Sequence, residues 1–277
     1  MIGRPPDTAG TRAASPTRGV RAGRPTATLR RVDVVGEVVA KGVRERRIDV
    51  ARGDRRIPGV LWTPEQSAAP VPLVMLGHGA SGSKREGYIV ALGRTLVRHH
   101  GLAALAIDGP VHGDRRHDGG ADGELAFLDF AQLWSSQEDL IDTMVADWRA
   151  ALDAVQALPE VAAGRCGYWG LSMGTIFGLP VVAAEPRVAV AVLGLMGIAG
   201  PTRQRFSADA PAVKCPVLFL VQWDDELFAR DRAVELFELL GSTDKRLHAH
   251  PGKHAEVPAE EFEASARFLA DALTFEA

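Results

Sequence analysis

Ser172 is the residue whose surroundings most clearly suggest chemistry. Residues 170–174 read Gly-Leu-Ser-Met-Gly, after a strand-like run at 165–169 and before an apolar segment at 175–184. A strand, a tight turn and a helix in this order project a serine hydroxyl from the end of a sheet and aim the first N–H groups of the helix at it. Glycines suit positions where the turn passes too close to neighbouring backbone for a side chain. The pattern predicts a nucleophile, provided that the chain also supplies a base, an acid and an oxyanion pocket.

His254 is the candidate base. It lies in the loop 251–258, after the last predicted strand and before the closing helix. In an open α/β sheet, ligands bind outside the carboxyl ends of the strands, so this loop and Ser172 should share one rim. His248 and His250 alternate within the strand and therefore share one face, where we expect them to be packed or solvated.

Asp225 is the candidate acid that orients the histidine and stabilises the imidazolium. It belongs to the run Trp-Asp-Asp-Glu at 223–226, which follows a predicted strand at 217–221 and faces the same rim. Two adjacent carboxylates cannot point the same way from an extended backbone. We prefer Asp225 and expect Asp224 to cap or shape the turn, as aspartate often does.

Two backbone N–H groups are the expected oxyanion donors. One belongs to Met173, directly after the serine, and the other to Ala80 in the small-residue loop 77–82. Small residues allow the backbone to approach a ligand closely. His78, in the same loop, could serve as a second base, but we expect it to tie the loop down.

Alternating strands and helices must position these residues. From residue 72 onward, buried strand-like runs alternate with segments of helical periodicity, and short β-branched runs at 32–39, 43–50 and 57–62 precede them. Such alternation favours a parallel sheet with helices on both faces, and the early runs favour antiparallel strands. The expected class is α/β, with a mostly parallel eight-stranded sheet, antiparallel N-terminal strands and one domain at 31–277.

Residues 109–137 form a long stretch that we expect to be an irregular loop and a short cover over the site, since loops of that length are usually functional. An apolar acyl or alcohol pocket is predicted nearby. Its expected lining is Phe127, Trp134, Met196, Trp223 and Phe228, although some of these side chains would also suit an ordinary core.

The same stretch holds a group of residues that resembles a metal cluster. His112 and His117 stand beside Asp114 and Asp118 in a glycine-rich run. Such a run fixes no ligand geometry, so we expect a solvated loop without a metal. No cofactor is predicted.

The order serine, acid, histidine resembles that of the α/β-hydrolase superfamily. The resemblance runs from about residue 40 to the end and rests on Ser172, Asp225, His254 and the His-Gly pair that begins at His78. Within the superfamily, the chain looks closest to small esterases grouped with dienelactone-hydrolase-like and peptidase-like proteins. True dienelactone hydrolases carry a cysteine nucleophile, so their substrate is not implied.

The resemblance implies acyl transfer to water through an acyl-enzyme. Ser172 would attack a carboxylic ester with His254 as base, and the oxyanion would rest on the two N–H groups. An amidase, peptidase or acyltransferase could use the same residues, and a non-catalytic ligand-binding protein could share the fold.

Composition sets the remaining expectations. The net charge of −3 gives no case for nucleic acid or an anionic membrane as a partner, and 46% hydrophobic with 24% charged residues is an ordinary globular balance. The two cysteines, Cys166 and Cys215, are expected to be buried free thiols, which favours a cytoplasmic protein. Residues 1–30 are expected to be a disordered basic tail. The early strands could offer an edge for a homodimer.

Overall fold

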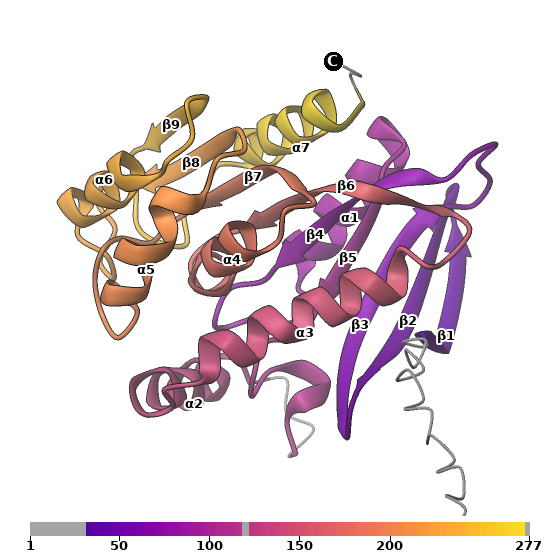
Figure 1. The fold of residues 1–277 in the computed structure, drawn as a ribbon, viewed down its shortest axis with the longest axis horizontal. Helices are drawn as coiled ribbons and strands as arrows, with labels where there is room; N and C mark the ends of the chain where they lie inside the picture. Colours follow the sequence, from indigo (N-terminus) through magenta and orange to yellow (C-terminus); the bar gives the residue numbers. More distant parts are fainter. Residues whose placement is uncertain (1–31, 118–121, 275–277) are drawn as a thin grey trace, which may run out of the picture.

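The computed structural model describes residues 32–117 and 122–274 of the chain. The predicted tail at 1–30 lies outside the described residues. Within them, strands and helices alternate along the chain and build one mixed sheet (Figure 1). None of the described helices is long and apolar enough to cross a membrane.

The strands are β1 (Val32–Ala40), β2 (Val43–Arg52), β3 (Arg55–Pro64), β4 (Val71–Gly77), β5 (Ala103–Ile107), β6 (Val161–Gly170), β7 (Val188–Gly194), β8 (Val217–Gln222) and β9 (Lys245–His250). The helices are α1 (Gly87–His100), α2 (Gly123–Ser136), α3 (Leu140–Val155), α4 (Met173–Ala184), α5 (Arg203–Asp209), α6 (Arg230–Leu239) and α7 (Ala259–Thr274), with short 3-10 turns at Gly113–Arg115 and Ala210–Ala212.

The sheet has the order β1-β2-β3-β5-β4-β6-β7-β8-β9. The first three strands are antiparallel, β3 lies antiparallel to β5, and all pairs from β5 to β9 are parallel. The predicted fold class is therefore confirmed. The sheet has nine strands where eight were expected, because all three N-terminal strands join it.

Helices cover both faces of the sheet, as predicted. The core on one face includes side chains of α3 and α4, whereas the core on the other includes side chains of α1 and α7. Figure 1 shows α3 and α4 crossing the near face. The parallel strands in the middle are buried on both sides, which explains why they read as continuous apolar runs.

The register of the parallel strands brings distant loops to one rim. Gly170 at the end of β6 pairs with Gly77 at the end of β4, and Gln222 at the end of β8 pairs with His250 at the end of β9. The loops that follow these four strands therefore leave the sheet at the same edge. These are the loops that carry the predicted site residues.

The prediction of an irregular loop at 109–137 is wrong for its second half, which is the helix α2. The carboxylate of Asp122 caps this helix by accepting hydrogen bonds from the N–H groups of Glu124 and Leu125. Asp, Asn, Ser and Thr are the usual caps of a helix start. Only Ala126 and Phe130 of α2 are buried, so its apolar side chains do not mark a conventional core face.

Candidate active site

The turn that carries Ser172 is strained and tightly packed. Ser172 lies between β6 and α4 with φ of 57° and ψ of −119°, a region that residues with a side chain rarely adopt. Its N–H donates to the carbonyl of Gly194 at 3.0 Å, which anchors the turn to β7. A Cβ at Gly170 would lie 2.7 Å from the carbonyl oxygen of Gly174, so glycine is required there. The hydroxyl is thus held at the rim by backbone contacts on both sides.

His254 bridges Ser172 and Asp225. Its Nε2 lies 2.9 Å from Ser172 Oγ, and its Nδ1 lies 2.8 Å from Asp225 Oδ2. With Nδ1–H donating to the carboxylate, Nε2 is left as the acceptor that faces the hydroxyl. This arrangement can remove the hydroxyl proton and stabilise the imidazolium that results.

Asp225 is well placed to remain ionised. Burial raises its pKa, but hydrogen bonds from His254 and from the N–H groups of Phe228 and Leu227 outweigh burial and hold the pKa below its ordinary value. Its Oδ1 accepts from the two N–H groups at 2.9 and 2.8 Å. The second oxygen is therefore fixed toward the histidine.

The neighbouring carboxylates have other partners. Asp224 Oδ2 accepts from the N–H of Gly252 at 3.4 Å, which gives this side chain a contact within the turn. Glu226 Oε2 accepts from the N–H of His254 at 2.9 Å. The structure thus brings Asp225, and not Asp224, to the imidazole.

The candidate oxyanion donors lie on either side of Ser172. Neither the N–H of Met173 nor that of Ala80 has a hydrogen-bond acceptor within residues 32–117 and 122–274. The carbonyl of Ala80 is 2.7 Å from His112 Nε2, and the N–H of the preceding Gly79 donates to the hydroxyl of Tyr88 at 2.7 Å. These contacts fix the peptide planes around Ala80 and leave its N–H available to a substrate.

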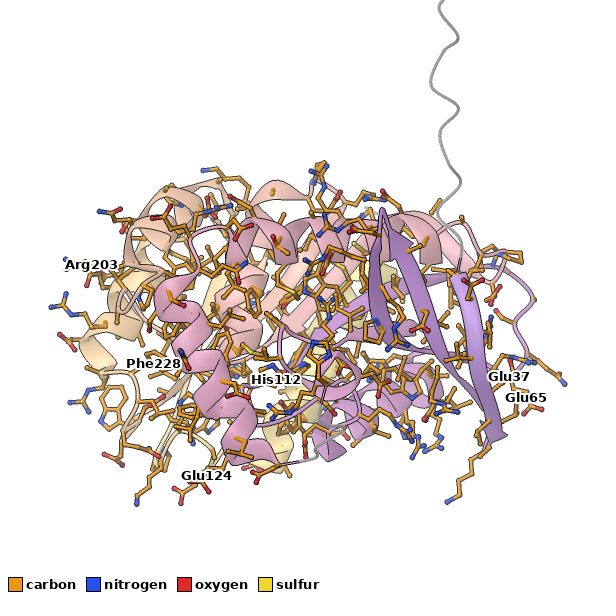
Figure 2. All side chains as sticks on the ribbon, turned by 90° about the horizontal axis from the view of Figure 1, so that it is seen from below. Glu37, Glu65, His112, Glu124, Arg203 and Phe228 are labelled. Atoms are coloured by element: carbon orange, nitrogen blue, oxygen red, sulfur yellow. The ribbon has the colours of Figure 1, made fainter. Side chains whose placement is uncertain are left out.

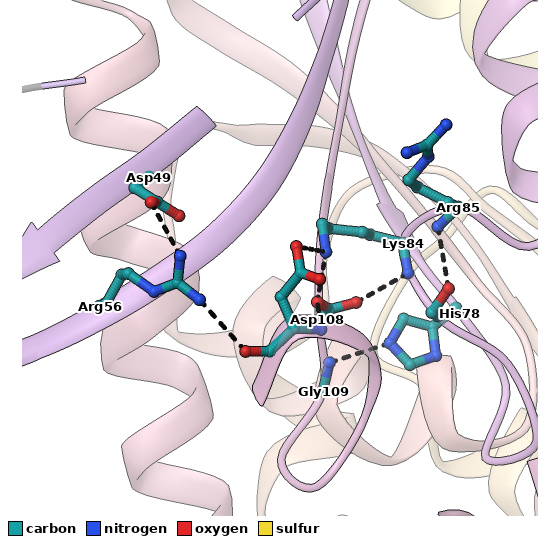
Figure 3. A network of polar contacts seen from close by, with 9 residues as sticks. Asp49, Arg56, His78, Lys84, Arg85, Asp108 and Gly109 are labelled. Atoms are coloured by element: carbon teal, nitrogen blue, oxygen red, sulfur yellow. Dashed lines mark hydrogen bonds and ion pairs between the residues drawn. The ribbon is translucent and has the colours of Figure 1, made fainter. Parts of the chain in front are cut away.

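Buried polar groups fasten the same loop from behind (Figure 3). Lys84 Nζ donates to Asp108 Oδ2 at 2.5 Å and to Asp114 Oδ2 at 2.8 Å, and the N–H of Lys84 donates to Asp108 Oδ1 at 3.0 Å. Lys84 and Asp108 are almost completely buried. Their pairing joins the loop after β4 to the turn after β5.

His78 also helps to hold this loop in place. Its Nδ1–H donates to the carbonyl of Gly79 at 2.8 Å, and its Nε2 accepts from the N–H of Gly109 at 2.9 Å. Burial, followed by the nearby His112, lowers the pKa of His78 to about 3. A neutral imidazole with both nitrogens engaged suits the tying role expected from the sequence, and not that of a second base.

A cavity of about 460 Å³ opens above Ser172 and His254. Its wall is mainly apolar and includes Tyr88, Phe127, Trp169, Leu227, Val257 and Phe262. Trp169 and Phe262 pack with ring centroids 5.7 Å apart, and Tyr88 lies 6.0 Å from each. Glu226 is the charged member of the wall apart from the histidine.

Of the five predicted pocket residues, only Phe127 lines this cavity. Met196 is fully buried in the core, and Trp134 stacks on Phe130 beside a separate hollow. Trp223 is half exposed, with the Arg230 guanidinium 4.1 Å from its ring centre. Phe228 packs against His254, with ring centroids 5.7 Å apart, and does not line the cavity. Its position is labelled in Figure 2.

Sequence reasoning missed the aromatic wall, although each of its members has a local signal. Trp169 stands three residues before Ser172. Tyr88 lies in the first turn of α1, after the loop that carries Ala80, and Phe262 lies in the first turn of α7, after His254. Residues this close to the ends of the site strands reach the same rim. Proximity to the motifs would have been a better guide than apolar character alone.

The residues suspected of resembling a metal cluster do not come together as ligands. His112 is fully buried against backbone carbonyls, and Asp114 pairs with Lys84. Asp118 lies outside the described residues. Within the described part of the chain, donor atoms that could hold a metal converge at His248, His250 and Glu261.

Comparisons with known proteins agree with the observed fold. A model of the dienelactone hydrolase family matches residues 57–266. The PEG-bound structure of a novel cold-adapted esterase from an Arctic intertidal metagenomic library is 39% identical, with a TM-score of 0.77 over 86% of this chain and 97% of that chain. An acetyl xylan esterase from Paenibacillus sp. R4 is 21% identical with a TM-score of 0.64 over 88% of each chain, which shows the fold alone.

A curated relative is more distant. YtaP of Bacillus subtilis strain 168, which is named as a hydrolase, is 27% identical over 150 residues. The match covers 50% of this chain and 48% of that protein, so the chain spans about half the length of this relative. The resemblance drawn from the motifs, to dienelactone-hydrolase-like esterases, is confirmed by the family match and by the structural neighbours.

Proposed function

The chain belongs to the dienelactone hydrolase family and is a hydrolase, and on that premise we propose that it is a serine esterase that cleaves carboxylic esters with Ser172, His254 and Asp225. The observation that carries the proposal is the continuous contact from Ser172 Oγ to His254 Nε2 at 2.9 Å and from His254 Nδ1 to Asp225 Oδ2 at 2.8 Å. It lies at the mouth of an apolar cavity, where an ester can reach the hydroxyl.

The proposed reaction has two halves. Ser172 Oγ attacks the ester carbonyl while its proton moves to His254 Nε2, and the N–H groups of Met173 and Ala80 hold the oxyanion. His254 then gives the proton to the departing alkoxide, which leaves an acyl-enzyme. Water then attacks the acyl-enzyme carbonyl while its proton moves to His254 Nε2. The imidazolium returns this proton to Ser172 Oγ as the bond to the acyl group breaks, which releases the carboxylic acid and restores the free enzyme.

The cavity supports a neutral substrate of small or medium size. Its wall combines aromatic and aliphatic side chains with one carboxylate, Glu226, and no lysine or arginine lines it within the described residues. A negatively charged acyl or alcohol group would meet repulsion there and find no cation to pair with. We therefore favour esters without a carboxylate of their own.

Hydrolysis of a matched panel would test this proposal. The wild-type protein and Ser172→Ala should be assayed on p-nitrophenyl acetate, butyrate and octanoate, on the corresponding anilides, and on mono-p-nitrophenyl succinate as the anionic partner of butyrate. We expect ester hydrolysis by the wild type only, with butyrate favoured over the succinate. Hydrolysis of anilides but not esters would contradict the esterase proposal and favour an amidase.

Two wider expectations also stay proposals. We propose a homodimer because β1 pairs only with β2 among the described strands and exposes Val34, Val35 and Val38 at an edge of the sheet. We propose a cytoplasmic location because Cys166 and Cys215 are free thiols. Light scattering after gel filtration would test the first, and fractionation of the producing cells the second.

A further inference from the structure

Three side chains outside the cavity converge on one point. His248 and His250 come from β9, and Glu261 comes from the first turn of α7. Their donor atoms all lie within 4.8 Å of one another. The sequence had suggested only that the two histidines share a face of the strand, because nothing in it showed which residue of α7 would lie opposite.

The carboxylate of Glu261 joins the two imidazoles. Its Oε1 lies 2.9 Å from His248 Nδ1, and its Oε2 lies 2.6 Å from His250 Nε2. The side chain of Glu261 is 3% exposed, whereas that of His248 is 41% exposed and that of His250 is 23% exposed. The cluster therefore has a buried carboxylate at its base and imidazoles that reach the solvent.

This donor set is the kind that holds a borderline divalent metal. Zinc takes imidazole nitrogen and carboxylate oxygen at about 2.0–2.2 Å in tetrahedral sites, where neighbouring ligand atoms are a little more than 3 Å apart. The carboxylate oxygens of Glu261 lie 2.6 to 3.1 Å from the imidazole nitrogens, and all the donor atoms lie within 4.8 Å of one another, so a small outward movement of the exposed imidazoles would admit an ion. The exposed side leaves room for water as a fourth ligand.

We propose that His248, His250 and Glu261 form a binding site for Zn²⁺ or a divalent ion of similar preference. The ion would take the place of the hydrogen bonds between the carboxylate and the imidazoles, and each neutral imidazole would then carry its proton on the ring nitrogen that does not bind the ion. Both histidines bind through a neutral ring nitrogen and Glu261 through its carboxylate oxygens.

The position of the site indicates a structural role. The strand β9 ends at His250 and α7 begins at Ala259, so the segment between the metal ligands is the loop that carries His254. None of the three ligands lines the cavity above Ser172. A bound ion would fasten both ends of the histidine loop and stabilise the folded protein without contacting the substrate.

Metal binding can be measured without the reaction. Untagged protein should be dialysed against EDTA and titrated with ZnSO₄ by calorimetry, with thermal unfolding recorded in parallel. We expect one strong site per chain and a rise in Tm of roughly 5 °C when free zinc is a hundredfold above Kd. A Co²⁺ titration should give the visible absorption of a four- or five-coordinate nitrogen and oxygen site.

Matched variants assign the site. His248→Asn with His250→Gln should abolish the calorimetric site, the Tm rise and the cobalt spectrum, while His99→Asn, on the exposed end of α1, should keep all three. Circular dichroism reports whether each variant is folded, and the wild-type cobalt spectrum tests the site without any variant. The absence of a strong site in the wild type, or an unchanged site in the double variant, would overturn the proposal.

Discussion

The loops on the two sides of Ser172 are held in different ways. The oxyanion side, residues 77–84 after β4, is held by buried groups. Lys84 donates a hydrogen bond to Asp108, and His78 accepts one from the N–H of Gly109. The histidine side, residues 251–258 after β9, is held by Asp225 and Glu226 through contacts that are partly open to solvent. Both loops leave the sheet at the same rim.

The difference follows from what each side would do. Oxyanion donors act by being in place before charge develops, so burial and fixed hydrogen bonds suit them. A general base must gain and lose a proton near neutral pH, so it cannot share that environment. His78 illustrates the point, since burial lowers its pKa to about 3 and it is 2% exposed, whereas the side chain of His254 is 13% exposed.

Removing the charge of Asp225 should have the largest effect on the histidine side. Asp225→Asn is expected to lower kcat by about 10³- to 10⁴-fold, because the amide no longer stabilises the imidazolium or fixes the tautomer of His254. Steady-state hydrolysis of a p-nitrophenyl ester would measure it. Asp224→Asn, one residue away, is the control and should stay within a few-fold of wild type, because among the described residues the Asp224 carboxylate contacts Gly252 and not His254. The reverse ranking would reassign the acid.

On the oxyanion side, the largest effect should come from breaking the buried ion pair of Lys84 and Asp108. It should lower the stability of the folded protein more than the rate of the reaction. Lys84→Met leaves the carboxylate of Asp108 buried without its cation, so the free energy of unfolding should fall by about 3–5 kcal/mol. Urea unfolding followed by fluorescence would measure it. Arg85→Met, at the exposed neighbouring position, should be close to neutral, and equal losses in both variants would show that burial of the pair is unimportant.

A falling pH should lower the stability of the folded protein through His78 before it protonates Asp225. The pKa of His78 is about 3 in the folded protein, against the ordinary value of 6.5 that we take for the unfolded chain. Between these two pH values the unfolded chain therefore binds one proton more than the folded protein at this residue. Stability should therefore decline as pH falls below 6.5, by up to about 1.4 kcal/mol per pH unit from this residue. Burial lowers the pKa of His112 as well, which acts in the same direction.

Urea unfolding at pH 7.5, 6.0 and 5.0 would measure that decline. His78→Gln should make the decline shallower, because the unfolded chain then gains no proton at this position while the contribution of His112 remains. His99→Asn should leave the decline unchanged. Asp225, whose pKa is lowered, adds its own loss only when pH falls below the ordinary value of 3.8. A stability profile that is flat from pH 7.5 to 5.0 in the wild type would contradict the assignment of a buried neutral His78.

The smallest expected effect concerns substrate charge at the edge of the cavity. Glu226→Gln keeps an acceptor for the N–H of His254 and removes the negative charge of the wall. The preference for p-nitrophenyl butyrate over mono-p-nitrophenyl succinate should fall by roughly twofold, since the group is exposed and screened. Glu256→Gln, also in this region but not part of the wall, is the matched control. An increased preference would rule out a charge effect of Glu226.

Sequence patterns were informative where local backbone geometry and strand order decide the outcome. The turn around Ser172 needs glycine for steric reasons, and the ends of parallel strands must meet at one edge, so Ser172, Asp225 and His254 could be placed together in advance. The class of the fold followed from the same alternation, although the count of strands did not.

Sequence patterns did not predict the features that depend on tertiary packing. Met196 and Trp134 looked as suitable for a pocket as Trp169 and Phe262, and only the crossing of β6 with α7 determines which rings meet above Ser172. The sequence did not predict the helix α2, because its apolar residues are not confined to one buried face. The usual helical periodicity of apolar residues is therefore missing from this segment. The pair of Lys84 and Asp108 likewise joins residues far apart in sequence.

Labelling of Ser172 tests the central claim most directly. Folded protein should be incubated with a reactive organophosphonate and digested, and the modified peptide identified by mass spectrometry. We predict one adduct, on Ser172, formed far more slowly in His254→Ala and absent from Ser172→Ala. If Ser172 remains unlabelled in a protein whose circular dichroism and thermal unfolding show it to be folded, the account of this rim as a serine hydrolase site is wrong.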